Sequence, residues 1–189
     1  DSLSAEVMAW TPGTKGVVTA ETYNLIPPQN PTIEELNAYF ATIKNQIKGK
    51  IVLTGKHNLI PIKFQASQFR MSDEEARKTF APEKPRTTPT PNPIPTVKRL
   101  SALEVNDEID KFLKTSGAIV RVYDAREPHG VIRAVINRTR DGSQFIPTII
   151  LRNEDYGRIA RILADGIVVK LEINITNQLF PEGNTQRNV

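Results

Sequence analysis

Two helix–strand pairs in the C-terminal half of the sequence most constrain the fold of this chain. In the first pair, a helical pattern that includes Asn106 passes through Gly117 into the apolar run 118–123. In the second, the apolar run 146–151 leads into a helix that ends at Gly166. Continuous apolar strands are typical of a sheet that is covered on both faces. The pattern therefore predicts a mixed α/β fold with roughly five to seven strands and three or four helices.

Helix starts are marked by capping boxes, in which a Ser or Thr and a Glu three residues later satisfy orphan backbone N–H groups. Three such pairs occur: Thr32–Glu35, Ser72–Glu75 and Ser101–Glu104. Gly49 and Gly117 are predicted to end the first and third helices, because glycine readily adopts the left-handed conformation found there. Asn153 is predicted to cap the last helix, with Glu154 and Asp155 at its positive end.

Further strands are predicted where β-branched and aromatic residues gather between turns. Beyond the two apolar runs, the candidates are residues 17–26, 50–55, 131–137 and 169–175. The last of these alternates apolar and polar residues, as a strand with one wet face does. Asp141-Gly142 is predicted to form a hairpin-type turn.

Residues 56–100 differ in composition from the rest of the chain. A short helix is predicted over 73–80, and the segment 81–96 that follows contains six prolines. Such a segment favours an extended, polyproline-like chain and cannot join the interior of a sheet. We interpret it as a semi-rigid spacer, and the alternative is a recognition segment or a flap.

Composition and charge argue against several classes of function. The 25 basic and 21 acidic residues leave a net charge of +4, and they are interspersed, so no nucleic-acid partner is predicted. No apolar run approaches the roughly 18 residues of a membrane-spanning helix, so no membrane partner is predicted either. The sequence has no cysteine, which excludes thiol chemistry.

The sequence carries no recognisable catalytic or metal-binding motif. Its two histidines, His57 and His129, lie in turns outside any metal-ligand spacing, and both are interpreted as exposed polar residues. There is no nucleophile elbow, and capping explains Ser101 and Ser116 at their helix ends. We therefore assign no catalytic residue, no metal ligand and no cofactor to this chain. The hypothesis that it is an enzyme in its own right has no constellation of residues to support it.

The order of these elements resembles the protease-associated (PA) domain, a non-catalytic insert of several peptidase families. The resemblance is carried by the two helix–strand pairs and by the helix-to-strand passage 47–53 (Ile-Lys-Gly-Lys-Ile-Val-Leu). The segments 10–18 and 179–189 are similar to the flanks of this insert in secreted zinc exopeptidases of the plasma glutamate carboxypeptidase group (carboxypeptidase Q-like). The resemblance implies a β-sandwich or open-barrel core flanked by three to four helices. Residues 56–100 look like an insertion relative to that pattern.

The resemblance also implies a function. The chain is expected to be a single PA-like domain over 1–189, excised from a zinc-dependent aminopeptidase or carboxypeptidase whose catalytic domain it lacks. It would act as a lid or as a module for substrate access or recognition. Its partners would be the catalytic peptidase domain of the same polypeptide and a peptide substrate. Zinc is expected in that catalytic domain, and the parent protein is expected to be extracellular or periplasmic.

A second hypothesis comes from a different class of function. The chain could be a free-standing protein-interaction module that presents its Pro-rich segment, 81–96, to the aromatic groove of a partner. The presence or absence of a His-x-Asp motif in the residues that follow Val189 in the parent protein would separate the two hypotheses.

The turn 126–130 is the predicted contact with substrate or with the catalytic domain. It follows the apolar strand 118–123, and ligands of open α/β sheets gather at the carboxyl ends of the strands. The guanidinium of Arg126 suits a peptide carboxylate, Glu127 lies beside it in the sequence, and His129 titrates near neutrality. The competing interpretation, which the sequence alone favours, is a solvated turn whose charges serve solubility.

Overall fold

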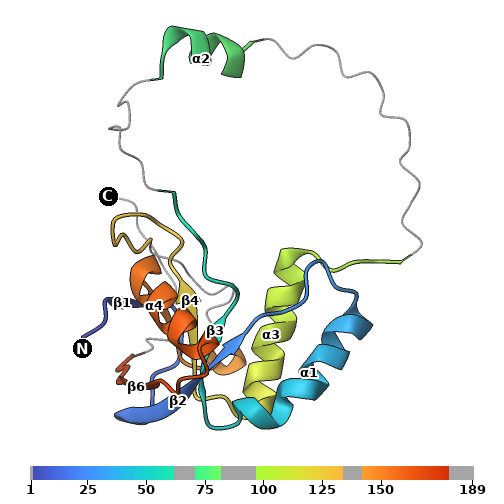
Figure 1. Ribbon diagram of the computed structural model, residues 1–189, viewed down its shortest axis with the longest axis vertical. Helices are drawn as coiled ribbons and strands as arrows, with labels where there is room; N and C mark the ends of the chain where they lie inside the picture. The colour runs from blue at the N-terminus through green and yellow to red at the C-terminus, as the bar shows by residue number, and fades with distance from the viewer. Residues whose placement is uncertain (1, 62–70, 82–96, 134–141, 179–189) are drawn as a thin grey trace. The chain divides into compact units, whose positions relative to one another are not determined.

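The structure, a computed structural model, describes residues 2–61, 71–81, 97–133 and 142–178 (Figure 1). The chain divides into two compact units, residues 1–60 together with 99–189, and residues 61–98. In the second unit, helix α2 (Asp73–Thr79) begins with the predicted capping box of Ser72 and Glu75 and has no buried residue. That residues 56–100 are an insertion relative to a family pattern stays a prediction.

The first unit is built on a curled, mixed sheet. Its described strands follow the order β1-β5-β4-β3-β2-β6, in which β2 to β5 run parallel and the edge strands β1 and β6 are antiparallel to their neighbours. The bounds are β1 (Ala5–Val7), β2 (Val18–Leu25), β3 (Ile51–Thr54), β4 (Val120–Asp124), β5 (Thr148–Leu151) and β6 (Lys170–Ile173). Both edge strands line one pocket of about 530 Å³, so the sheet curls toward an open barrel. The mixed α/β class is confirmed, and the assignment to the PA type stays a prediction.

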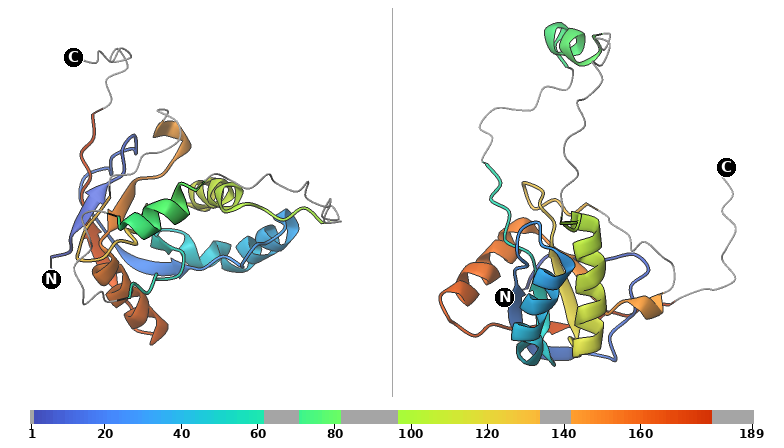
Figure 2. Two further views of the ribbon diagram at one scale, coloured as in Figure 1. Left: turned by 90° about the horizontal axis from the view of Figure 1, so that it is seen from above. Right: turned by 90° about the vertical axis from the view of Figure 1, so that its right-hand side faces the viewer.

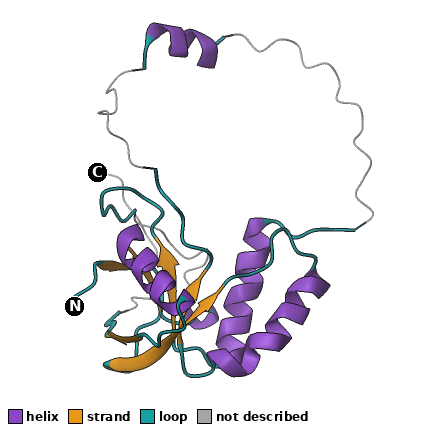
Figure 3. Ribbon diagram, viewed as in Figure 1, coloured by secondary structure: helices purple, strands orange, loops and turns teal. Residues whose placement is uncertain are grey.

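Helices cover both faces of this sheet, which explains why its central strands are mostly apolar. Helices α1 (Ile33–Ile47) and α3 (Ala102–Ser116) contact each other on one face (Figures 2 and 3). Leu25 and Val52 join their core, where the rings of Phe40 and Phe112 stack with centroids 4.0 Å apart.

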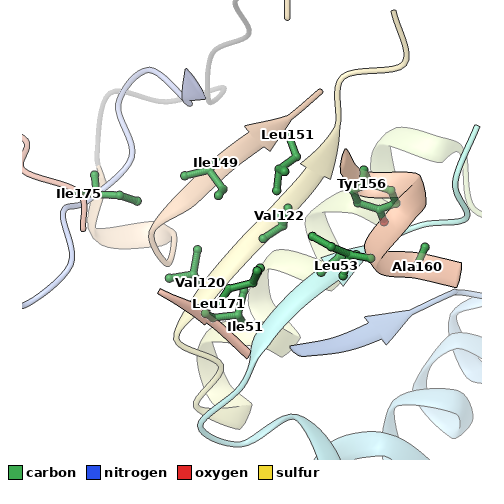
Figure 4. Packing of buried hydrophobic residues seen from close by; sticks show 11 residues of the cluster. Ile51, Leu53, Val120, Val122, Ile149, Leu151, Tyr156, Ala160, Leu171 and Ile175 are labelled. Atoms are coloured by element: carbon green, nitrogen blue, oxygen red, sulfur yellow. The ribbon is translucent and has the colours of Figure 1, made fainter. Parts of the chain in front are cut away.

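Helix α4 (Asn153–Ala164) packs against the opposite face of the sheet. Its Tyr156 and Ala160 lie against Leu53 and Val122 of the central strands, as Figure 4 shows. Val52 and Leu53 therefore point to different cores, as the alternation of side chains along a strand requires.

The ends of the long helices agree with the sequence prediction. The capping boxes of Thr32 and Ser101 are both formed, and they start α1 at Ile33 and α3 at Ala102. Gly117 ends α3 in the left-handed conformation, with φ of 76°. These signals are strong because the groups that satisfy each other lie within one helical turn.

Several local predictions are wrong. The N-cap of α4 is Arg152, without a side-chain cap, and Asn153 is the first helical residue, with its side chain engaged elsewhere. Residues 131–133 form no strand, so the strand predicted over 131–137 is wrong at its start, and its remainder lies outside the described residues. The hydroxyl of Ser116 is buried and has no hydrogen-bond partner among the described residues, so capping does not explain it.

Two further differences concern short elements. Strand β1 was not predicted, because a run of three residues is too short to show a strand pattern, and all three are exposed. Of the predicted Asp141-Gly142 hairpin turn, Asp141 lies outside the described residues, and Gly142 begins a short 3-10 helix that ends at Gln144.

Candidate functional site

The parallel strands β2, β3 and β4 have their carboxyl ends on the same side of the sheet, and a cleft of about 500 Å³ opens there. The segments that follow the three strands line it, with Pro27 to Pro31 after β2, Gly55 after β3 and Ala125 to Glu127 after β4. The first turns of α3 form a further wall. The carboxyl ends of strands are the usual place for a ligand in an open α/β sheet, so this cleft is the candidate site.

Arg121 of β4 lies at the base of the cleft and is the charged residue that sequence analysis missed. Its side chain is only 1% exposed. Its Nε–H donates to the Thr54 hydroxyl at 3.2 Å, and one Nη group donates to the Asn106 amide oxygen at 3.0 Å. The other Nη group donates to the carboxylate of Asp110, and the guanidinium lies 4.2 Å from the centre of the Tyr123 ring.

The sequence held a signal for this cluster. Arg121 is the one charged residue within the apolar run 118–123, and a charge in a strand covered on both faces must be paired. Asn106 and Asp110 lie four residues apart on the preceding helix, and therefore on one face of it. Together these facts would have predicted a contact between Arg121 of β4 and the side chains of Asn106 and Asp110 on α3.

Asp124, the last residue of β4, ties three loops together at the edge of the cleft. Its buried carboxylate accepts hydrogen bonds from the backbone N–H groups of Asn58 at 3.0 Å and Arg126 at 2.9 Å. The side-chain amide of Asn153 donates to both carboxylate oxygens at 3.0 Å, and also to the carbonyl of Asn58 at 2.8 Å. Asn153 therefore holds Asp124 and the loop after β3 together, and does not cap α4 as the sequence predicted.

His57 is packed against α4, although the sequence predicted an exposed residue. Its ring is half-buried, and its Nε2 lies 3.4 Å from the side-chain oxygen of Asn153. The ring occupies the space beside Gly157, where an added Cβ would lie 2.6 Å from His57 Cε1. The imidazole therefore fills a structural position between the loop after β3 and the helix.

Tyr156 links the same helix to the end of β3. Its hydroxyl donates to the carbonyl of Gly55 at 2.7 Å. Burial raises the pKa of this phenol, the Asp124 carboxylate raises it further, and the charges of Arg126 and Arg121 oppose the rise. The phenol therefore stays protonated and keeps its hydrogen bond near neutral pH.

The predicted contact turn is only partly placed at the cleft. Arg126 and Glu127 line it, with Arg126 exposed and Glu127 half-buried. His129 is exposed and is not among the residues that line the cleft. Glu127 pairs with Arg133 at 2.7 Å, and the N–H of Gly130 donates to Glu154 of α4 at 3.0 Å. That these residues contact a substrate or a catalytic domain stays a prediction.

The side chains that line the cleft are mostly apolar, amide or charged. Within the described part of the chain they include no serine, cysteine, histidine or lysine. The carboxylates of Asp124 and Glu127 are already engaged with hydrogen-bond donors. Elsewhere among the described residues, no three His, Cys, Asp or Glu side chains gather into a metal-binding group. None of the described helices is long and apolar enough to cross a bilayer.

Comparison with known proteins finds remote structural likeness only. No family model matches the chain, and no curated protein matches its sequence. An aminopeptidase from Aneurinibacillus sp. strain AM-1 is similar over 93% of this chain and 28% of its own, with 13% identity and a TM-score of 0.49. A Peptidase M28 precursor from Shewanella amazonensis SB2B is similar over 93% of this chain and 33% of its own, with 11% identity and a TM-score of 0.42.

Both of these structural neighbours are peptidases, and this chain spans a third or less of the length of each. Similarity this remote does not carry the activity, substrate or partners of either protein over to this chain.

Proposed function

We propose that this chain is a non-catalytic accessory domain of a zinc-dependent exopeptidase, acting as a lid or as a module for substrate access or recognition. The observation that carries the proposal is the cleft at the ends of β2, β3 and β4, which offers cationic and apolar groups without a nucleophile–base pair. Such a cleft has room for part of a peptide, and among its described residues no nucleophile–base pair supports cleavage. The reaction class of the parent protein rests on the resemblance of the sequence to PA domains.

The physical logic of such a domain is exclusion and positioning. A rigid module beside an active site blocks large folded substrates and places polar groups near the end of a short peptide. The zinc would be held by the peptidase domain of the parent polypeptide, and the parent would act outside the cytoplasm. These two parts of the proposal rest on the sequence resemblance alone.

The alternative function, a free-standing interaction module, depends on the Pro-rich segment 81–96. All but Ala81 of this segment lies outside the described residues. The alternative therefore rests on composition, whereas the accessory role has a described cleft in its support.

The parent enzyme provides the test. Residues 1–189 are replaced by a short Gly/Ser linker, and kcat/KM is measured on short peptides and on a folded protein substrate. We expect an altered kcat/KM on peptides and faster cleavage of the folded protein, with the zinc content of the peptidase domain retained. Unchanged kinetics on both substrates, in a folded and zinc-loaded variant, would refute the accessory role.

The chain by itself tests where the zinc lies. Purified without added metal, it should hydrolyse no peptide and contain no stoichiometric zinc. A stoichiometric zinc signal that disappears on changing His57 or His129 to Ala would contradict the placement of the zinc in the peptidase domain.

A further inference from the structure

We propose that the cleft is a carboxylate-binding site in which Arg126 binds the C-terminal carboxylate of a short peptide and the apolar wall receives its last side chain. This inference deepens the proposed function by naming the ligand. It rests on that function only for the peptide as the source of the carboxylate.

The charges around the cleft leave one cation without a counter-ion. Of its three arginines, Arg121 is paired with Asp110 and Arg133 is paired with Glu127. Within the described part of the chain, the guanidinium of Arg126 makes no hydrogen bond and no ion pair. A cation that lines a cleft in this way is available to an anionic ligand.

The remaining carboxylate of the cleft does not neutralise Arg126 by side-chain contact. Asp124 is filled by donors from Asn58 and Asn153 and by the backbone N–H of Arg126 itself. The Asp124 carboxylate thus fixes the backbone of Arg126. The guanidinium of Arg126 remains available to a ligand.

The backbone of Arg126 is held in one conformation. Its backbone adopts a left-handed conformation with φ of 56°, which a non-glycine residue takes only when its surroundings enforce it. Its Nη2 lies over Gly55, 3.7 Å from where a Cβ of that residue would be. The side chain therefore reaches back over the end of β3, where the cleft opens.

The rest of the cleft suits the end of a peptide better than a bare anion. Leu100, Val105 and Ile109 contribute apolar side chains to the lining of the same cleft. A volume of about 500 Å³ lies within the range of small-ligand sites. A carboxylate attached to an apolar side chain uses both the charge of Arg126 and these apolar groups.

The charge balance favours a carboxylate over a phosphate. One unpaired guanidinium matches a single negative charge, whereas a phosphate group carries about −1.5 to −2 at neutral pH. The carboxylates of Asp124 and Glu127 would repel that additional charge.

The test measures binding to the chain 1–189 by NMR titration of its backbone amides. N-acetyl-leucine is compared with N-acetyl-leucinamide, which keeps the side chain and removes the charge, and with inorganic phosphate. We expect saturable shifts at Gly55 and Arg126 with the acid, and binding weaker by about tenfold or more with the amide and with phosphate.

Two variants assign the effect to Arg126. Arg126→Gln removes the charge at an exposed position and should weaken binding of the acid by about tenfold or more. Arg161→Gln makes the same change in the last turn of α4, outside the residues that line the cleft, and should alter binding by less than about twofold. Melting temperatures of both variants establish that they are folded.

The outcomes separate this inference from the proposed function. Equal binding of the acid and the amide, or unchanged binding by folded Arg126→Gln, would overturn the carboxylate site. So would the absence of saturable shifts up to roughly 10 mM acid, well above the mM affinity of a weak small ligand. Tighter binding of phosphate would overturn the choice of ligand. None of these results affects the linker experiment on the parent enzyme, which tests the accessory role independently.

Discussion

At the scale of single residues, the buried guanidinium of Arg121 is the most demanding group in the chain. Removing a charge from water costs several kcal/mol, and the pairing is stable only because Asp110, Asn106 and Thr54 satisfy its donors together. These residues join β4 to α3 and to the end of β3. Because Arg121, Thr54 and Asn106 all line the cleft, their hydrogen bonds hold that part of its lining together.

Asp110→Ala should destabilise the chain by about 3–5 kcal/mol, because it leaves the charge of Arg121 buried without a counter-ion. Urea unfolding at neutral pH measures the loss. Asp107→Ala provides a matched change on the same helix at a residue that is not a partner of Arg121, and should cost about 1 kcal/mol or less. Equal losses of unfolding free energy in the two variants would show that the buried ion pair contributes no more to stability than an ordinary helix carboxylate.

Asp155 gives a second prediction at this scale, through pH. Burial acts to raise its pKa, but the Arg152 side chain, the Ser4 N–H and the charges of Arg152 and Arg158 outweigh it, so the pKa lies below its ordinary value of 3.8. Arg152 holds this carboxylate at 2.6 and 3.0 Å, and the N–H of Ser4 donates to it at 3.1 Å. A lowered pKa stabilises the fold above the pKa of the unfolded chain, and this stabilisation disappears as pH falls through the folded-state value.

Asp155→Asn should therefore lower the free energy of unfolding by about 1.5–3 kcal/mol at pH 7, the range for hydrogen bonds to a charged group. The difference from the unchanged chain should shrink as pH falls below about 4. Denaturant unfolding at a series of pH values measures it. A difference that stays constant from pH 7 to pH 2 would show that the charge of Asp155 does not contribute.

At the scale of elements, α4 is fixed to the sheet by its first two turns. Tyr156 donates a hydrogen bond to Gly55 at the end of β3, and Asn153 donates to Asp124 at the end of β4. Asp155 accepts a hydrogen bond from Ser4, which precedes β1. The ring of His57 fills the place that a side chain at Gly157 would take. A glycine inside this helix is therefore explained by a close contact and not by the helix itself.

A double-mutant cycle tests that contact. Alanine is normally favoured over glycine in a helix by about 1 kcal/mol, but the Cβ of Gly157→Ala would collide with His57. We expect Gly157→Ala to be neutral or destabilising in the unchanged chain, and stabilising by up to about 1 kcal/mol in the His57→Ala background. Thermal unfolding of the four variants measures the coupling, and additive effects would contradict the packing of His57 against Gly157.

At the scale of the whole molecule, the first unit of the chain is a curled sheet with helices on both faces and a cleft where β2, β3 and β4 end. The segments that line this cleft come from residues 8–55 and 100–150. All of these described lining residues belong to the first unit.

Replacing residues 81–96 by a short Gly/Ser linker should change the free energy of unfolding by less than about 1–2 kcal/mol. Prolines cannot donate to a ladder, and this segment offers few apolar side chains to a core. Thermal melting of the two chains makes the comparison. A larger loss would show that the segment packs as part of the domain and is not a spacer.

The sequence pointed to one segment of the cleft, the turn after β4, but not to its other walls or to its buried charge. Arg126 and Glu127 of that turn line the cleft, and their contact with a ligand stays a prediction. His129, three residues after Arg126, does not line it, because the left-handed conformations at both residues turn the chain. The direction of a turn depends on such backbone angles, which residue type alone does not set.

The sequence by itself determined where α1 and α3 begin, where α3 ends, and the order of the apolar strands along the chain. The capping boxes at Thr32 and Ser101 are satisfied within one turn, and a strand buried on both faces must be apolar wherever its neighbours lie. Only the tertiary structure decided the partners of Arg121, the role of Asn153 and the burial of His57. Each of these depends on groups brought together from different elements, up to 96 residues apart for His57 and Asn153. Such contacts are selected by packing and by the need to satisfy buried polar groups, which no local pattern encodes.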